Sequence, residues 1–332
     1  MRSVSLPNSN RETTQLGFGC AFWPAVTEQM ALRMLEAAYD AGIRHFDTAP
    51  YYLDGRSEHY VGQFLESHPD CTVTTKYGLL PLSARPLHIK VARAVLGPLV
   101  RRLRKLKKPS QQTSTSAGVG SKASYGVDDA RRSLEKSLQR LRRTSVDLFL
   151  THEPETDDLD RAGFLEFLQQ QVESRRIGAI GVGGEFERAA AAHASKPGLF
   201  DVMQYNWDAL DQRSIPAKFQ VHYWVFSSDF SALHASLSQD KHAAGIWSDS
   251  IGVDVTDAGV LRAVMLKAAL LANPNGIVLV HSSKAENIYR NVEVASEDRL
   301  VSEARRLLEL GASQSLPRPA RSPANQESAQ TS

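Results

Sequence analysis

Short apolar runs alternate with segments of helical periodicity along most of the chain. Each run is short enough for one strand, and the segment after it repeats its apolar residues every three or four positions, as amphipathic helices do. The runs predict strands over 16–22, 45–48, 72–77, 146–152, 177–183, 201–205, 221–226 and 276–281. The periodic segments predict helices over 28–41, 57–67, 127–142, 160–174, 185–194, 256–272, 284–294 and 296–309.

This alternation also indicates the fold class. Strands that alternate with helices form mostly parallel sheets covered by the helices, which is the α/β class. Eight strands, nearly all followed by a helix, over roughly 300 residues favour a closed (β/α)8 barrel over an open sheet. We therefore predict one barrel domain over residues 1–311.

Two segments lie outside the repeat. Residues 312–332 are rich in Ser, Pro, Gln and Ala and have almost no large apolar residue, which predicts a disordered tail. Residues 79–126 form an insert between the third strand and the third helix. The apolar residues of 86–108 recur at roughly helical spacing with Lys and Arg largely between them, so we expect basic helices, bent or split at Gly97-Pro98.

Composition places the chain among globular proteins, since 42% of its 332 residues are hydrophobic and 8% are aromatic. The net charge of +2 conceals an uneven distribution. No acidic residue lies between Asp70 and Asp128, while 11 of the 39 Lys and Arg residues do. The rest of the chain has 28 basic against 37 acidic groups, so the basic character is local and does not predict nucleic-acid binding.

Cysteine usage and the first residues of the chain indicate the compartment. Cys20 and Cys71 form neither a CxxC motif nor a disulfide framework, which fits a reducing environment. Residues 1–15 lack the apolar core of a secretory signal. No apolar run approaches the roughly 18 residues of a membrane span. These features predict a cytoplasmic protein.

Four polar residues fall at the carboxyl ends of neighbouring predicted strands, where barrel enzymes hold their active sites. Asp47 ends the second strand and Tyr52 lies just beyond it, Lys76 ends the third strand, and His152 ends the fourth. Each alone has a structural explanation, such as a turn cap, a packed aromatic ring or a solvated lysine. Together they indicate a catalytic site, because burying several ionisable groups without a function is costly.

Three segments around these residues carry a longer pattern: GIRHFDTAPYY (42–52), TTKYG (74–78) and RRSLEKSLQRLRRTSVDLFLTH (131–152). They resemble the aldo-keto reductase superfamily. The resemblance runs from about residue 16 to residue 291, interrupted by the insert. Glu58 and Gly62, in SEHYVG (57–62), resemble the rest of the superfamily's first signature, and the longer loop resembles that of its bacterial sugar- and aldehyde-active branches.

The resemblance implies a catalytic tetrad of Asp47, Tyr52, Lys76 and His152 that interconverts a carbonyl and an alcohol with a nicotinamide cofactor. Hydride that reaches a carbonyl carbon leaves negative charge on the oxygen, which must be protonated or stabilised. Tyr52 is the expected proton donor. The ammonium of Lys76 is expected to lower its pKa from about 10 by up to about three units, less the opposing cost of burial. Asp47 would orient Lys76, and His152 would orient the carbonyl.

Glycine-rich strand ends supply the first candidate cofactor contacts. GFG, which ends at Gly19, and GVGGEFE (181–187) each follow a strand, but neither completes GxGxxG. The resemblance places a carboxamide-binding Ser-Asn pair at Gly183 and Gly184, so this chain lacks two side-chain hydrogen bonds there. It also implies that Gln204 contacts the carboxamide and that Phe226 stacks on the nicotinamide ring.

The segment VHSSKAENIYRN (280–291) resembles the superfamily's adenine-phosphate segment. The resemblance implies that Ser282, Ser283 and Lys284 contact phosphate and that Asn291 contacts the adenine. Asn287 stands where many NADPH-preferring members have Arg, and a neutral side chain weakens the case for a 2′-phosphate. Lys284 supplies one charge, so we favour NADP slightly over NAD.

Other classes of function were weighed. The ten histidines form no HExxH or similar cluster, so no metal site is predicted, and there is no GxSxG or P-loop. A lysine at a strand end is compatible with a Schiff-base aldolase, which leaves Asp47, Tyr52 and 280–291 unexplained. The missing Ser-Asn pair is compatible with a regulatory module that binds cofactor with little turnover. The substrate, a small carbonyl compound, is not identified by the sequence.

The basic segment 86–108 has three interpretations. Its helices pack on the barrel, or they form a lid over the active site, because the insert follows the third strand. Alternatively, they dock on an acidic partner or an anionic membrane surface. We expect a monomer or weak oligomer.

Overall fold

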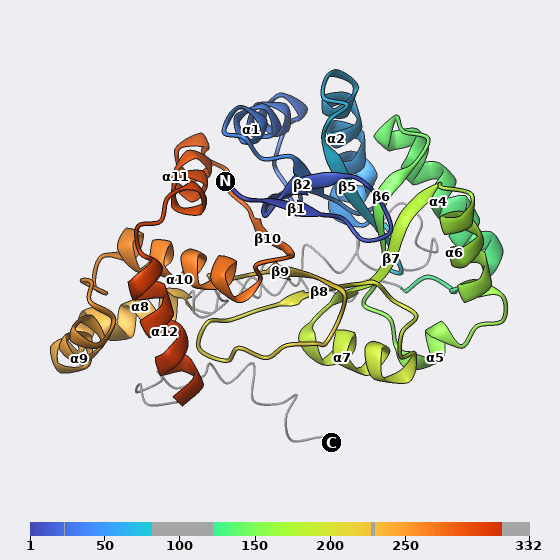
Figure 1. Cartoon of the computed structure of the whole chain (residues 1–332). Coiled ribbons are helices and arrows are strands. Elements are labelled where there is room, and N and C mark those ends of the chain that lie inside the picture. Colours follow the sequence, from blue (N-terminus) through green and yellow to red (C-terminus); the bar gives the residue numbers. More distant parts are fainter. Residues whose placement is uncertain (23, 82–121, 227–229, 314–332) are drawn as a thin grey trace, which may run out of the picture.

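The computed structural model describes residues 1–22, 24–81, 122–226 and 230–313. Within them, eight parallel strands close into a barrel in chain order, and the last strand pairs with the first (Figure 1). The predicted (β/α)8 barrel is confirmed, with every predicted strand present. The barrel strands are β3 (Leu16–Gly19), β4 (His45–Asp47), β5 (Thr72–Tyr77), β6 (Val146–His152), β7 (Ile177–Gly184), β8 (Val202–Asn206), β9 (Phe219–Tyr223) and β10 (Ile277–Val280), and two further strands, β1 (Ser3–Ser5) and β2 (Glu12–Thr14), precede them.

Helices lie around the outside of the strands (Figure 1). They form because their apolar residues share one face, as in the first helix, which buries Ala31, Leu35 and Ala38. The helices are α1 (Glu28–Asp40), α2 (Arg56–Ser67), α4 (Val127–Leu141), α5 (Thr156–Leu159), α6 (Phe164–Glu173), α7 (Phe186–Ser195), α8 (Phe230–Gln239), α9 (Lys241–Ile251), α10 (Ala258–Ala272), α11 (Ala285–Ser296) and α12 (Val301–Ser313), with a 3-10 turn η1 (Tyr52–Gly55).

Two helices, α8 and α9, lie where the sequence pattern predicts no element. Each helix buries only about one residue per turn, and polar Ser, His and Asp residues lie between the buried ones, so the periodic signal is weak. The buried residues are Phe230, Leu233 and Leu237 in α8, and Ala244, Trp247 and Ile251 in α9.

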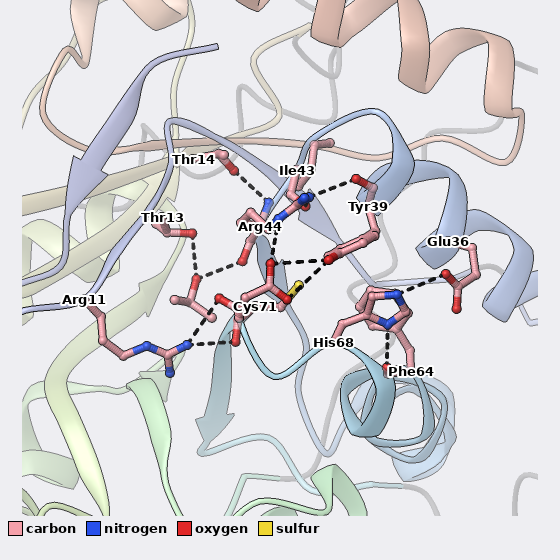
Figure 2. Close-up of polar contacts among 12 residues, drawn as sticks. Arg11, Thr13, Thr14, Glu36, Tyr39, Ile43, Arg44, Phe64, His68 and Cys71 are labelled. Atoms are coloured by element: carbon pink, nitrogen blue, oxygen red, sulfur yellow. Dashed lines mark hydrogen bonds and ion pairs between the residues drawn. The ribbon is translucent and has the colours of Figure 1, made fainter.

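A hairpin of β1 and β2, also not predicted, covers one end of the barrel. Val4 and Leu6 pack against the apolar residues of the barrel interior. Arg11 donates to the backbone oxygen of Cys71 at 3.1 Å, and Figure 2 shows this contact within a polar network at that end. Each hairpin strand has three residues, which is too short for periodicity to reveal.

Side chains along each barrel strand alternate between the interior and the surrounding helices. Asp47, Lys76 and His152 each lie two positions beyond an interior residue, so the alternation points them into the carboxyl end of the barrel. This is the end at which barrel enzymes place their chemistry. The interior residues include His45, Thr74, Leu148, Leu150, Ala179, Val202, Val221, Ile277 and Leu279.

The predicted basic helices of 86–108 and nearly all of the predicted tail, 314–332, lie outside the described residues. The flanks of the insert are described. Leu79 forms an antiparallel bridge with Lys122, and Ala123 N–H donates to the oxygen of Gly78 at 2.7 Å. The two flanks therefore lie side by side beyond β5. No helix among the described residues is long and apolar enough to cross a membrane.

Candidate active site

Asp47 and Lys76 form a buried ion pair at the ends of β4 and β5. Lys76 Nζ lies 2.5 Å from Asp47 Oδ1 and also donates to the backbone oxygen of Thr48 at 3.0 Å. The second oxygen of Asp47 accepts a hydrogen bond from Gln204 Nε2, on β8, at 2.7 Å. With both of its oxygens engaged, Asp47 fixes the position of Lys76 inside the barrel mouth.

Tyr52 begins the turn η1 and lies against this ion pair. Lys76 Nζ donates to its hydroxyl at 3.4 Å and lies 4.9 Å from its ring centroid. Leu53 and Asp54 have φ values of 51° and 61°, in the left-handed region that residues with a side chain rarely adopt. Such a backbone persists only where surrounding contacts hold it.

A second ion pair supplies those contacts. Glu58 of α2 is fully buried, accepts from Thr75 Oγ1 at 2.6 Å and pairs with Arg140 of α4 at 3.1 Å. The same guanidinium packs against Gly55, where φ is 85° and a Cβ would stand 2.7 Å from it. Arg140 thus ties the end of the Tyr52 turn to α2 and α4.

Burial, and then the charge of Asp47, raise the pKa of Tyr52 well above its ordinary value. A net lowering of this pKa is therefore not found, because the opposing cost of burial is the largest contribution. Lys76 Nζ lies 3.4 Å from the Tyr52 hydroxyl and 2.5 Å from Asp47 Oδ1, so both charges of the ion pair are near the phenol. Tyr52 is held as a neutral phenol, which is the form that can donate a proton.

His152 ends β6, and its ring meets that of Tyr52 edge-on, with centroids 5.9 Å apart. Burial, and then the charge of Lys76, lower the pKa of His152 well below its ordinary value, so the imidazole is neutral near pH 7. Tyr125 donates to the backbone oxygen of His152 at 3.4 Å. Gly78 (φ 142°) packs against the same oxygen, where a Cβ would stand only 2.4 Å away. The structure thus brings all four tetrad residues together.

Neighbouring side chains fill the space beside the glycine pair at the end of β7. A Cβ on Gly183 would stand 2.9 Å from Gln204 Oε1, and a Cβ on Gly184 would stand 2.9 Å from Glu153 Oε2. Neither position takes a larger side chain unless these neighbours move. The polar groups beside this glycine pair are therefore the amide oxygen of Gln204 and the carboxylate of Glu153.

The residues expected at the adenine end gather around the start of α11. Ser282 is buried, and its hydroxyl accepts from the N–H of Lys284 at 3.0 Å, which shapes the turn before the helix. Ser283, Lys284 and Asn287 are exposed, and Asn291 is half-buried one turn beyond Asn287. A helix N-terminus beside a lysine attracts phosphate, so these residues fit the anionic part of a dinucleotide.

Gly19 and Phe226 lie near the ends of β3 and β9. A Cβ on Gly19 would meet only the backbone oxygen of Val280, at 3.7 Å, so the chain there leaves room for a ligand. The oxygen of Gly19 accepts from His281 Nδ1 at 2.8 Å. Phe226 is half-buried and packs on the outer core, three residues beyond the strand.

Sequence reasoning missed two residues at this end of the barrel. Tyr223, the last residue of β9, packs on the interior residues, and burial followed by the charge of Glu153 raises its pKa well above the ordinary value. Tyr223 lies two positions after the interior residue Val221 on the same strand, and this alternation could have identified it. Glu153 follows His152 and turns toward β7. No periodic pattern predicts that direction, because it depends on one backbone angle, a φ of 55°.

Residues 15–221 match the model of the aldo/keto reductase family. D-threo-aldose 1-dehydrogenase of a Pseudomonas species is 31% identical to this chain over 188 residues, which cover 51% of this chain and 49% of that protein. The chain therefore spans about half the length of this curated relative.

Solved structures of similar fold cover nearly the whole chain. The aldo-keto reductase of Bacillus halodurans, in its holo form, matches with a TM-score of 0.68 and 17% identity, over 97% of this chain and 100% of that one. A mutant of the protein Gox0644 in complex with NADPH matches with a TM-score of 0.60 and 17% identity, over 93% of each chain. At 17% sequence identity, the similarity to these two structures establishes the fold of this chain.

Proposed function

Because this chain belongs to the aldo/keto reductase family, we propose that it is an NAD(P)H-dependent oxidoreductase that interconverts an aldehyde, ketone or sugar carbonyl with the corresponding alcohol. One observation carries the proposal: the Tyr52 hydroxyl, the ion pair of Lys76 with Asp47 and the ring of His152 meet at the mouth of the barrel. A carbonyl that is reduced by hydride needs a proton donor, a nearby positive charge and a group that orients its oxygen.

A nicotinamide cofactor held at the barrel mouth would supply the hydride, or accept it in the reverse direction. Tyr52 donates the proton to the carbonyl oxygen as negative charge develops there. Its raised pKa keeps the hydroxyl protonated until the substrate is in place. As the proton leaves, the ammonium of Lys76, 3.4 Å away, stabilises the phenolate that forms.

Asp47 and His152 set the geometry for this step. Asp47 holds Lys76 within reach of the Tyr52 hydroxyl, and Gln204 holds Asp47. His152 stays neutral, so it donates a hydrogen bond to the carbonyl oxygen without competing as an acid. Lys76 Nζ pairs with Asp47 and reaches the Tyr52 hydroxyl, and a Schiff-base aldolase would leave Tyr52 without a role, so the geometry favours reduction over an aldolase.

We assign the cofactor contacts to the residues around the glycine pair of β7 and to those at the start of α11. Gly183, Gly184, Gln204 and Phe226 would surround the nicotinamide end, with Gly19 leaving room for it. The start of α11 would hold the phosphates, and Lys284 supports NADP slightly over NAD because it adds a positive charge for a 2′-phosphate.

A substrate screen tests this function. Purified protein is incubated with NADPH or NADH and a panel of aldehydes, ketones and aldoses, and oxidation of the reduced cofactor is followed by its absorbance. We expect turnover with at least one class of carbonyl. Tight cofactor binding with no turnover in the whole panel would contradict the proposal and favour the cofactor-binding module.

A further inference from the structure

The side chain of Gln204 crosses the interior of the barrel. Gln204 lies on β8, two positions beyond the interior residue Val202, and is 3% exposed. Its Nε2 donates to Oδ2 of Asp47, on β4, at 2.7 Å. In the closed order of the barrel strands, β8 is four steps from β4 in either direction, so these two strands lie opposite each other. The hydrogen bond therefore links the two sides of the barrel mouth.

The chemistry of the partners fixes which end of the amide faces Asp47. A carboxylate accepts hydrogen bonds and donates none, so the amide nitrogen faces it and the amide oxygen faces away. The oxygen lies beside Gly183 of β7, where a Cβ would stand 2.9 Å from it. A larger residue at this position would crowd the amide, so the glycine leaves Gln204 the room to reach Asp47.

Asp47 is thereby held at both of its oxygens. The side chains of Asp47 and Lys76 are 5% and 2% exposed, so water does not readily replace a lost partner. Without the amide, the carboxylate of Asp47 can turn about its last side-chain bond, and the ammonium paired with it moves too. That ammonium lies 3.4 Å from the hydroxyl of Tyr52, and a misplacement of about 1 Å at a reacting group can slow a reaction about 100-fold.

We propose that Gln204 is a positioning residue for proton transfer: through Asp47 it holds the ammonium of Lys76 within reach of the proton donor. This inference rests on the proposed function and adds a second role to the cofactor contact proposed for this residue. The amide nitrogen sets the rate of reduction, whereas the amide oxygen is the atom left to contact the cofactor. Gln204→Met removes both polar atoms, and Gln204→Glu keeps the shape of the side chain but places a second carboxyl group against Asp47.

The pH profile of Gln204→Glu is the sharpest test. Two carboxyl groups at hydrogen-bond distance resist double ionisation, so they share a proton at low pH and lose it as the pH rises. While the proton is shared, the introduced carboxyl still bonds to Asp47. We expect its first-turnover rate at saturating NADPH to lie within about threefold of the wild type at about pH 5 and at least about tenfold below it at about pH 8.

The other ionisable groups at the mouth do not imitate this profile. Burial raises the pKa values of Tyr52 and Tyr223 well above the ordinary value and lowers that of His152 well below it, so none of them titrates between about pH 5 and about pH 8. Burial also raises the pKa of Glu153, but the wild type has the same group, so its titration cancels in the ratio of the two rates. A ratio that does not change with pH would overturn the proposal.

Gln204→Met and Gln15→Met form a matched pair. Gln15 is also buried, with 6% exposed, and its amide donates to the backbone oxygen of Leu270 at 2.7 Å, at the amino end of β3. We expect Gln204→Met to lower the first-turnover rate about 10- to 100-fold and Gln15→Met to leave it unchanged, with circular dichroism to establish that both are folded. Equal losses, or a Gln204→Met whose only defect is weaker NADPH binding in fluorescence titrations, would overturn the proposal. If Gln204→Met does not fold, the pH profile of Gln204→Glu decides.

Chemical labelling separates this inference from the proposed function. If the wild type reduced no carbonyl, the proposed function would fail, but the hold on Lys76 would still be measurable as its rate of acetylation by acetic anhydride, followed by mass spectrometry. Lys267, which is 5% exposed and donates to the backbone oxygen of Glu297, is the internal reference. Gln204→Met, and Gln204→Glu at alkaline pH, should raise the ratio of the Lys76 rate to the Lys267 rate several-fold. An unchanged ratio would overturn the inference whether or not the protein reduces carbonyls.

Discussion

Arg140→Met tests the buried ion pair that holds the Tyr52 turn. Arg140 and Arg142 both lie at the end of α4, are 30% and 37% exposed, and pair with glutamates of α2. Their partners differ, because the side chain of Glu58 is 0% exposed and that of Glu66 is 53% exposed. Met keeps much of the length of Arg and removes its charge, so Arg142→Met is a matched control.

The structure sets the size of the effect. Removing one partner of a buried pair costs about 3–5 kcal/mol, whereas an exposed pair contributes about 0–1 kcal/mol. The loss at Glu58 is smaller than the full value because Thr75 still donates to it at 2.6 Å and because the carboxyl can take up a proton. We expect Arg140→Met to lower the free energy of unfolding by about 2–4 kcal/mol at pH 7. Arg142→Met should lower it by less than about 1 kcal/mol.

The effect of Arg140→Met should also depend on pH. Burial already raises the pKa of Glu58, and losing Arg140 raises it further. The folded variant then binds a proton that the unfolded chain has released, so its stability falls as the pH rises. Lowering the pH from about 7 to about 5 should recover stability relative to the wild type, by at most about 1.4 kcal/mol per pH unit. Urea unfolding at both pH values measures this. A loss no larger than that of Arg142→Met, or one that is equal at both pH values, would refute the reasoning.

Three further predictions concern packing, pH and the cofactor. Gly62→Ala should lower the free energy of unfolding by about 2 kcal/mol or more in urea, because its Cβ would stand 2.0 Å from the backbone oxygen of Arg140. A loss below about 0.5 kcal/mol would contradict this packing. Burial lowers the pKa values of His45 and His222 to about 3. Below about pH 6.5 only the unfolded chain therefore takes up these protons, so acidification should lower the free energy of unfolding by up to about 1.4 kcal/mol per pH unit for each histidine. His45→Gln should remove part of this fall between about pH 6.5 and about pH 4, and an unchanged slope would count against it. Asn287→Arg should raise the affinity for NADPH relative to NADH about tenfold in fluorescence titrations, and an unchanged ratio would mean that α11 does not face the 2′-phosphate.

The barrel and the grouping of the tetrad could be predicted because both depend on local signals. Each strand has its own apolar run, and the closure of parallel strands brings their carboxyl ends together whatever the loops do. Asp47, Lys76 and His152 therefore needed only their positions at three strand ends to be placed near one another.

Features that depend on single angles or distances could not be predicted. The direction of Glu153 depends on the backbone angle of one left-handed residue, and the raised pKa of Tyr52 follows first from burial and then from the charge of Asp47. The sequence indicated which groups meet, but desolvation and pairing decide their pKa values. The N-terminal hairpin and helices α8 and α9 were missed because each buries few residues per turn or strand.

The central claim is that Tyr52 donates the proton in carbonyl reduction, and Tyr52→Phe tests it most directly. Phenylalanine keeps the ring beside Lys76 and removes only the hydroxyl. The measurement is kcat/KM for reduction together with the Kd of the NADPH complex. We predict a loss of about 100-fold or more in kcat/KM with the Kd unchanged within about threefold, because general acid catalysis contributes about 10²–10⁴-fold. A variant that keeps more than about a tenth of the wild-type kcat/KM would contradict the assignment.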